Sequence, residues 1–274
     1  MPELPEVETI RRDLARRLAG RRVEKLTRAV PAMLRELPPA RLRQAVEGRR
    51  FLEPGRHGKL LRLPLEEGAE LGVHLGMSGR LTVDERSVEA GAHTHVEMLL
   101  EDGARLRFRD PRRFGRWALT ANGRTWGRLF GNAGVDPLDP AFDEPALRSI
   151  LSRARGEVKR LLLDQSRVAG LGNIYVCEAL HRARIHPARR ADKVARPAAA
   201  RLHRAILEVL RTALESRGTT LNDYRDAEGR PGGFQRLLRV YDREGEACPG
   251  CGRKVRRILQ AGRSTYFCPG CQRR

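Results

Sequence analysis

The sequence predicts an α+β protein of several domains, and three observations along the chain support this prediction. Short apolar or alternating runs between residues 22 and 120, separated by Gly, Pro and Asp-Gly turns, are typical of a β-sandwich. From residue 144 onward the apolar period becomes helical. Two Cys-x-x-Cys pairs near the C-terminus indicate a metal-binding hairpin. We therefore expect an N-terminal β-sandwich with flanking helices, a helical domain and a C-terminal β-hairpin zinc finger.

The domain boundaries follow from changes in composition. Residues 131–145 are rich in Gly, Asp, Asn and Pro and lack an apolar period, so we interpret them as a linker. This divides the chain into a sandwich domain of residues 1–130, a helical domain of residues 146–240 and a zinc finger of residues 241–274. A glycine-bounded polar loop, residues 217–234, falls within the helical domain in this scheme.

The expected elements can be given in chain order. Val7, Ile10, Leu14 and Leu18 lie at helical spacing, with Pro5 suited to the first turn and Gly20 just past the end. The expected strands are 23–30, 59–65, 70–75, 95–100 and 105–109, with a short helix at 40–47. The expected helices of the second half are 144–155, 157–164, 173–183 and 197–217. In the zinc finger we expect strands at 254–259 and 264–267, with residues 260–263 at the hairpin tip.

The charge indicates a polyanionic partner. The chain of 274 residues has 54 Lys and Arg against 34 Asp and Glu, a formal net charge of +20. The arginines are spread through the chain, which is typical of basic folded surfaces that bind nucleic acid. No apolar run approaches the ~18 residues of a membrane helix, and no signal-peptide pattern is present. We expect a cytoplasmic protein with no membrane partner.

The cysteine spacing predicts one structural zinc ion and no organic cofactor. Cys248 and Cys251 form one pair and, sixteen residues later, Cys268 and Cys271 form the second. Four thiolates close a tetrahedral site, which leaves no open position for chemistry. The fifth cysteine, Cys177, lies beside apolar residues of a predicted helix, so we expect a buried thiol.

The first residues form a candidate reactive site. Removal of Met1 would leave Pro2 with a free secondary amine, and such an amine can attack a sugar carbon to form an iminium. Glu3 and Glu6 lie beside it at the start of the first helix. The positive end of the helix dipole lowers the pKa of a nearby amine, whereas the two carboxylates raise it, and the sequence leaves that balance open.

The opening Pro-Glu-Leu-Pro-Glu-Val-Glu-Thr resembles the N-terminus of formamidopyrimidine-DNA glycosylases. The run Gly-Leu-Gly-Asn-Ile-Tyr at residues 170–175 is similar to the start of a helix in that family's helix-two-turns-helix. The resemblance runs from Pro2 to Cys271. It implies a monomeric glycosylase and abasic-site lyase of the bacterial cytosol or nucleoid. The enzyme would remove 8-oxoguanine and formamidopyrimidines from damaged duplex DNA during base excision repair. Its mechanism would be a proline Schiff base followed by β,δ-elimination.

The resemblance also implies roles for individual residues. Pro2 would be the nucleophile, Glu3 the proton donor and Glu6 a residue that orients the terminus. Lys59, in Arg-His-Gly-Lys, and Arg263, in the zinc finger, would assist the elimination. The residues implied to contact DNA are His93, Arg112, Lys159 and Asn173, and a helix start preceded by glycines suits a phosphate near Asn173.

Two loops match the segments that fill the gap left by an everted nucleotide. Met77 lies on the glycine-flanked turn after residue 75, and Arg112 and Phe114 lie on the loop that follows the strand at 105–109. A glycosylase that flips a nucleotide must replace it in the base stack, so the resemblance implies that Met77, Arg112 and Phe114 are inserted into the duplex.

Two other functions remain open at this point. The first is the related endonuclease that removes oxidised pyrimidines. The polar loop at 217–234 favours the purine branch instead. The endonuclease branch also usually has Gly in place of Leu4. The loop itself has Gly232 and Gly233 where the family has a single glycine. The second is a DNA-binding zinc-ribbon protein without catalysis, which would retain Met1.

Overall fold

The computed structural model describes residues 2–84, 89–121, 126–221 and 224–273. The chain divides into two compact units, which we describe separately. Unit 1 comprises Met1–Asn132 and Ser216–Gly233, and unit 2 comprises Ala133–Glu215 and Phe234–Arg274. The loop that we assigned to the helical domain thus groups almost entirely with unit 1 in this division. Our finer domain boundaries stay a prediction.

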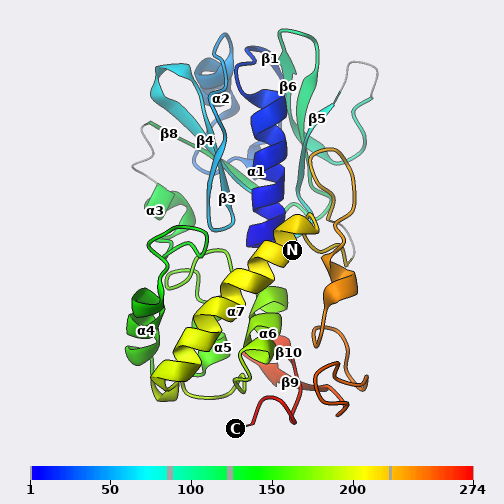
Figure 1. The fold of residues 1–274 in the computed structure, drawn as a ribbon. Coiled ribbons are helices and arrows are strands. Elements are labelled where there is room, and N and C mark those ends of the chain that lie inside the picture. Colours follow the sequence, from blue (N-terminus) through cyan, green and yellow to red (C-terminus); the bar gives the residue numbers. More distant parts are fainter. Residues whose placement is uncertain (1, 85–88, 122–125, 222–223, 274) are drawn as a thin grey trace. The chain divides into compact units, whose positions relative to one another are not determined.

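Unit 1 contains two antiparallel four-stranded sheets, as expected for the sandwich (Figure 1). One sheet has the order β1-β6-β7-β5 and the other β2-β3-β4-β8. The strands of the first sheet are β1 (Val23–Ala29), β5 (Arg80–Asp84), β6 (Thr94–Leu100) and β7 (Arg105–Arg109). Those of the second are β2 (Gly55–His57), β3 (Leu60–Pro64), β4 (Ala69–His74) and β8 (Arg116–Ala121). The five strands that the sequence predicts are present; β2, β5 and β8 were not predicted individually.

Helix α1 (Leu4–Leu18) contacts both sheets, through β5 of one and β2 and β3 of the other. The residues that form its apolar stripe, Val7, Ile10, Leu14 and Leu18, are all at most 1% exposed. They belong to the same core cluster as Phe108 and Trp117 of the sheets. The sandwich core therefore fixes the position of the chain's first residues.

The remaining elements of unit 1 are short. They are α2 (Pro39–Val46), α3 (Trp126–Phe130) and the 3-10 turns η1 (Pro31–Met33) and η2 (Glu66–Gly68). Helix α3 lies just before the region that we interpreted as a linker and was not predicted.

Unit 2 is helical except for one hairpin. Its helices are α4 (Glu144–Ser152), α5 (Val158–Leu163), α6 (Asn173–Arg182) and α7 (Arg196–Glu215), with 3-10 turns η3 (Ala191–Lys193) and η4 (Phe234–Leu237). The four helices match those predicted, with ends that differ by at most three residues. Helix α7 packs on α4 and α6, and α6 packs on α5 and on the hairpin. No helix of the described residues combines the length and apolar character needed to cross a bilayer.

The hairpin consists of β9 (Arg256–Gln260) and β10 (Arg263–Phe267), with Gln260 paired to Arg263. The turn is therefore formed by two residues, Ala261 and Gly262, with φ of 49° and 72°. Positive φ at both central residues is typical of the tight turns that close such hairpins. This corrects our expectation that residues 260–263 form the tip, because Arg263 begins the second strand.

Candidate functional site

The N-terminal residues are held at the start of α1. Glu3 immediately precedes the helix, and its backbone N–H donates to Glu6 Oε2 at 2.8 Å. This bond satisfies one of the N–H groups that a helix start leaves without an intrahelical partner. In the chain that begins with Met1, Pro2 is buried, as are Glu3 (4% exposed) and Glu6 (2%). The structure thus brings Pro2, Glu3 and Glu6 together, as the sequence predicts.

The same glutamate holds the polar loop. Glu6 Oε1 accepts a hydrogen bond from the backbone N–H of Thr219 at 2.7 Å. A Cβ placed on Gly218 would lie 2.8 Å from that oxygen, and Gly218 has a φ of +86°, so glycine suits this position in two ways. One carboxylate therefore links the chain's first residues to a segment more than two hundred residues later.

An ion-pair network built on two buried aspartates fixes the base of this loop. The Arg217 guanidinium lies 2.5 Å from carboxylate oxygens of both Asp13 on α1 and Asp226 in the loop. Burial raises the pKa of Asp13, although Arg217 opposes that effect. Burial also acts to raise the pKa of Asp226, but hydrogen bonds from the Arg230 backbone and from Arg217 and Arg230 side chains lower it overall. Sequence reasoning missed this network, because its members are far apart in the chain.

Lys59 lies just before β3, at the end of the sheet where β4 finishes. Leu60 pairs with His74, and the Lys59 side chain is 9% exposed. Burial, with the positive charge of Lys59 second, lowers the pKa of His74 to about 4. A neutral His74 accepts the backbone N–H of Gly76 through Nδ1 at 3.1 Å. Lys59 is thus placed near the loop that carries Met77.

Met77 and Phe114 have exposed apolar side chains on neighbouring loops. Met77 is 39% exposed and Phe114 is 50% exposed. The backbones of the two loops lie so close together that a Cβ on Gly76 would be 2.5 Å from the carbonyl carbon of Phe114. The Arg112 guanidinium lies over the Phe114 ring, 5.0 Å from its centroid. The left-handed φ of 56° at the intervening Arg113 shapes this turn. The three residues proposed for insertion are therefore brought together on adjacent loops.

His93 belongs to the same region. It is exposed, has a φ of 67°, and its carbonyl oxygen accepts the backbone N–H of Asp110 at 3.0 Å. Asp110, which the sequence analysis does not identify, is completely buried and forms hydrogen bonds with Ser78, Gly115 and the His93 carbonyl oxygen. It resembles an ordinary turn residue before a proline in the sequence, so only the structure reveals its contacts.

Unit 2 brings together the other predicted residues. Lys159 on α5 is 1% exposed, and its Nζ donates to the Ser264 carbonyl oxygen at 3.1 Å and to Thr265 Oγ1 at 2.5 Å. Asn173, the first residue of α6, donates through Nδ2 to the same Ser264 oxygen at 2.8 Å. Arg263, the residue before Ser264, is exposed. Lys159 and Asn173 thus hold the strand that carries Arg263.

A cavity of about 470 Å³ lies beside this junction. Its lining includes three arginines, Arg160, Arg167 and Arg263, which come from α5, the following loop and β10. The acidic residues Glu157 and Asp164 also contribute to its wall. Arg160 and Arg167 are not residues that the sequence analysis identified, because arginine is common throughout the chain.

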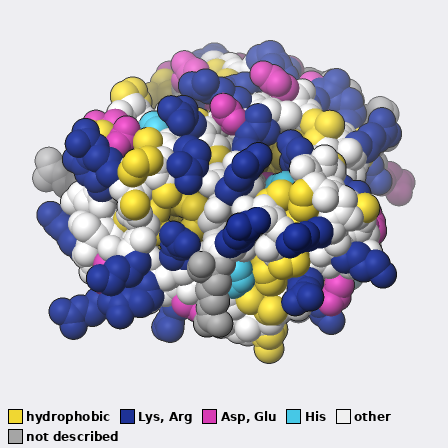
Figure 2. Space-filling view, turned by 60° about the horizontal axis from the view of Figure 1, so that its bottom comes forward, with side chains coloured by type: hydrophobic (Ala, Val, Ile, Leu, Met, Phe, Trp, Pro, Cys, Tyr) yellow, Lys and Arg dark blue, Asp and Glu magenta, His cyan; other side chains and the backbone are white. Residues whose placement is uncertain are grey.

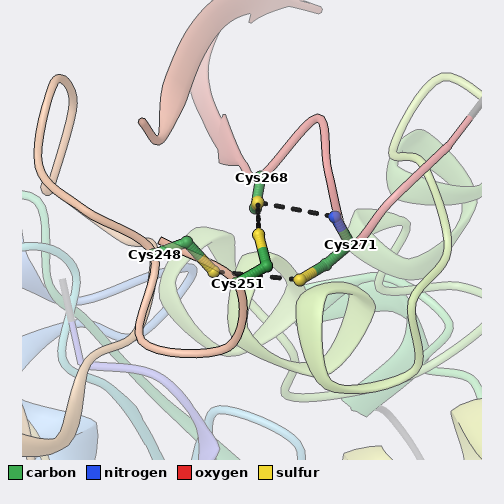
Figure 3. A group of neighbouring side chains, drawn as sticks. All are labelled: Cys248, Cys251, Cys268 and Cys271. Carbon is green, nitrogen blue, oxygen red and sulfur yellow. Dashed lines mark hydrogen bonds between the residues drawn. The ribbon is translucent and has the colours of Figure 1, made fainter. Parts of the chain in front are cut away.

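The four cysteines form a site with the donors that zinc prefers. Their Sγ atoms all lie within 4.8 Å of one another, with Cys251 and Cys268 at 3.3 Å and Cys248 and Cys271 at 3.9 Å (Figure 3). Four sulfurs at this spacing suit a tetrahedral structural zinc ion. His181 Nε2 also lies 3.3 Å from Cys248 Sγ, and such outer contacts orient zinc ligands. Cys177 is buried, as expected.

Basic side chains are abundant on the surface. Figure 2 shows Lys and Arg spread across the whole visible face, as expected for a chain with a formal net charge of +20. Exposed arginines occur beside the candidate residues in both units, including Arg112 and Arg113 in unit 1 and Arg263 in unit 2. Surfaces of this kind attract a polyanion over long distances.

Three family models match the chain, and together they cover most of it. The formamidopyrimidine-DNA glycosylase N-terminal domain matches residues 1–117 and the formamidopyrimidine-DNA glycosylase H2TH domain matches residues 133–225. The zinc finger found in FPG and IleRS matches residues 245–274.

Whole proteins match over their full length. A curated protein of Desulforamulus reducens, named formamidopyrimidine-DNA glycosylase, is 45% identical over 276 residues, which covers 100% of this chain and 99% of the relative. The crystal structure of MutM (Fpg) from Thermus thermophilus is similar with a TM-score of 0.88 and 45% identity, covering 99% of this chain and 98% of that one. A Lactococcus lactis Fpg variant in complex with DNA containing Fapy-dG has a TM-score of 0.92 and 33% identity, with both chains covered completely.

Proposed function

Because the chain belongs to the formamidopyrimidine-DNA glycosylase family, we propose that this DNA repair glycosylase is bifunctional and excises oxidised purines from duplex DNA. Its substrates are 8-oxoguanine and formamidopyrimidines, and it cleaves the resulting abasic site in base excision repair. The observation that carries this proposal is the Glu6 carboxylate, which binds both the residue next to Pro2 and the loop at Thr219. Such an arrangement suits a nucleophile and a substrate loop that act on the same nucleotide.

The reaction begins at Pro2 after removal of Met1. The secondary amine attacks C1′ of the everted nucleotide, the bond from C1′ to the base breaks, and the base leaves with the proton that the amine releases. Glu3 donates a proton to the ring oxygen, which allows the sugar ring to open. The product is an iminium between Pro2 and the open sugar. Glu6, which accepts the Glu3 N–H at 2.8 Å, orients the terminus for this attack.

Elimination then cleaves the DNA strand. The iminium acidifies the proton at C2′, and its loss expels the 3′ phosphate; a second elimination expels the 5′ phosphate. Lys59 in unit 1 and Arg263 in unit 2 assist by neutralising the phosphates. The burial of Lys59 beside a neutral His74 and the exposure of Arg263 at the start of β10 are consistent with these roles.

DNA binding and eversion rest on the loops of unit 1 and the hairpin junction of unit 2. Met77, Arg112 and Phe114 enter the base stack, and His93 contacts the DNA. The exposure of Met77 and Phe114 supports insertion, because large apolar side chains gain most from contacts in a partner. Asn173 and Lys159, which the resemblance implies contact DNA, also hold the strand of Arg263. The zinc ion, held by the four cysteines, stabilises the hairpin.

The loop at 217–234 closes over the damaged base. Its attachment to α1 through Glu6 and Arg217 gives it a fixed base near the amine. The Lactococcus lactis relative solved with Fapy-dG DNA favours a purine-derived substrate for this chain as well. We further propose that the protein acts as a monomer in the bacterial cytosol.

Borohydride trapping tests the mechanism. Reduction of the iminium during turnover on an 8-oxoguanine duplex should link protein and DNA covalently, and Pro2→Gly should strongly reduce the yield of the adduct. Mass spectrometry of the mature protein should show that Met1 is absent. An adduct that survives Pro2→Gly unchanged, or a retained Met1, would overturn the scheme.

A lesion panel tests the substrate class. Duplexes with 8-oxoguanine or a formamidopyrimidine should be cleaved much faster than one with dihydrouracil. Faster cleavage of dihydrouracil would assign the chain to the pyrimidine-specific branch.

A further inference from the structure

Asp110 contacts the three segments of unit 1 that lie beside Met77, His93 and the Arg112-Phe114 turn. Its side chain is 0% exposed. Its two carboxylate oxygens have separate partners: Oδ1 accepts from Ser78 Oγ at 2.6 Å, and Oδ2 accepts from the backbone N–H of Gly115 at 2.7 Å. Ser78 follows Met77, and Gly115 follows Phe114.

The backbone of Asp110 extends the same connection. Its N–H donates to the carbonyl oxygen of His93 at 3.0 Å, and its carbonyl oxygen lies 2.9 Å from His95 Nε2. The Ser78 hydroxyl in turn accepts the backbone N–H of Arg112 at 3.3 Å. One buried residue thus connects the neighbours of Met77, His93, Arg112 and Phe114.

Steric contacts leave these loops little freedom to move separately. A Cβ on Gly115 would lie 2.4 Å from the Phe108 ring, and one on Gly79 would lie 2.2 Å from the Leu75 carbonyl oxygen. The loop backbones therefore pack directly on each other and on the sheet. Hydrogen bonds between closely packed backbones set relative position more strictly than side-chain contacts between exposed residues.

We propose that Asp110, acting through Ser78 and Gly115, is a positioning residue that holds Met77 and the Arg112-Phe114 turn as one rigid insertion unit. It touches neither the lesion nor the reacting sugar. This inference rests on the proposed function, because it assumes that these three side chains enter the base stack. Its loss should impair eversion of a damaged base more than cleavage of a site from which the base has already gone.

Substitutions can separate the two hydrogen bonds. Ser78→Ala removes the link to the Met77 loop and leaves the bond from Gly115 to Asp110. Asp110→Ala removes both links, whereas Asp110→Asn retains a matched shape, with an amide oxygen for Gly115 N–H and an amide N–H for Ser78 Oγ. Thr27→Val is a matched control, because Thr27 Oγ1 donates to Glu97 Oε1 at 2.7 Å in the same sheet but in neither loop.

The experiment compares single-turnover excision of 8-oxoguanine with lyase cleavage of a preformed abasic site. We expect Ser78→Ala and Asp110→Ala to slow excision about tenfold or more, since small misplacements of positioning groups have effects of this size. Lyase cleavage should stay within about threefold of the unmodified protein. A 2-aminopurine beside the lesion should show a slower fluorescence rise in both variants, and Asp110→Asn should restore most of the rate.

Two results would overturn the inference. One is excision by Asp110→Ala at the rate of the Thr27→Val control. The other is an equal loss of excision and lyase cleavage in Ser78→Ala and Asp110→Ala, which indicates general damage to unit 1. Failure of the proposed function would differ from both, because the unmodified protein would then give no borohydride adduct.

Discussion

Glu6 and Thr219 are joined by a 2.7 Å hydrogen bond from the Thr219 backbone N–H to Glu6 Oε1, while the other Glu6 oxygen accepts the N–H of Glu3. Each oxygen of this buried carboxylate thus accepts a main-chain N–H, one from the start of the same helix and one from a segment more than two hundred residues later. A carboxylate suits this position because it only accepts hydrogen bonds when ionised. The arrangement couples the order of the polar loop to the geometry of the N-terminus.

Replacement of Glu6 by Gln should therefore loosen the loop. Gln has one acceptor oxygen, so one of the two N–H donors would face an amide N–H, at a cost of about 1–3 kcal/mol for a buried unsatisfied group. We expect faster hydrogen exchange in residues 216–221 and a loss of excision of about tenfold or more.

Glu47→Gln provides the control for this change. Glu47 accepts the Leu26 N–H through Oε1 at 2.9 Å and forms a partly exposed ion pair with Arg43, and Gln can keep the hydrogen bond. If Glu6→Gln and Glu47→Gln gave the same exchange pattern, the coupling through Glu6 would be contradicted.

The pH dependence of stability should contain a contribution from His74. Its folded pKa is about 4, lowered by burial and then by Lys59, whereas the unfolded value is near 6.5. Between these values the unfolded state binds a proton that the folded state does not. The free energy of unfolding should thus fall by up to about 1.4 kcal/mol for each unit that the pH drops through this window.

His74→Asn tests this contribution, since its amide oxygen can replace Nδ1 as the acceptor for Gly76 N–H. Denaturant unfolding can be followed through the chain's two tryptophans, Trp117 and Trp126, which both lie in unit 1. The variant should lose less stability between pH 6.5 and pH 4.5 than the unmodified protein. Parallel curves would show that His74 titrates normally.

Lys159→Met should weaken DNA binding without changing its salt dependence. Its ammonium group donates to Ser264 and Thr265 in the interior of unit 2, so we expect an indirect effect through the strand of Arg263. A lysine that neutralises a phosphate contributes close to 0.9 to the slope of log affinity against log salt.

Arg263→Gln is the comparison for Lys159→Met. We expect Arg263→Gln to reduce the slope by close to one phosphate, and Lys159→Met to lower the affinity at every salt concentration by a similar factor. A reduced slope in Lys159→Met would instead mean that Lys159 itself reaches the DNA, as the family resemblance implies.

Removal of zinc should strongly weaken DNA binding while leaving unit 1 intact. Structural zinc ions contribute about 10–16 kcal/mol to small modules of this kind, so Cys251→Ala or a strong chelator should unfold the hairpin. We expect DNA affinity to fall about 100-fold or more, with no change in the tryptophan unfolding curve. Cys177→Ala, which removes a thiol outside the cluster, should retain one zinc per chain; loss of zinc there would contradict the assigned ligands.

Local patterns were enough to predict much of the fold. The stripe from Val7 to Leu18 marks α1, and the cysteine spacing marks the zinc site, because both depend on residues close in sequence. Strand β5 was missed because it begins directly after the glycine-rich turn at Gly76 and Gly79. The hairpin tip was placed too broadly because Ala261, unlike Gly262, gives no sign that it adopts a positive φ.

The candidate site was predictable only in part. The resemblance identified the exposed residues Met77, Arg112 and Phe114, but not the buried groups that support them. Asp110 and the Arg217 network depend on tertiary contacts between segments that no periodicity connects. The burial of Lys159 was equally inaccessible, because a lysine in a short helix is usually solvated.

The junction at Ser264 has one further consequence. Lys159 and Asn173 both donate to its main-chain carbonyl oxygen, which every amino acid would supply. Position 264 can therefore change identity during evolution without deleting the acceptor, whereas either donor is lost by a single substitution. Substitutions should therefore be common at position 264, which supplies the acceptor, and rare at Lys159 and Asn173, which supply the donors.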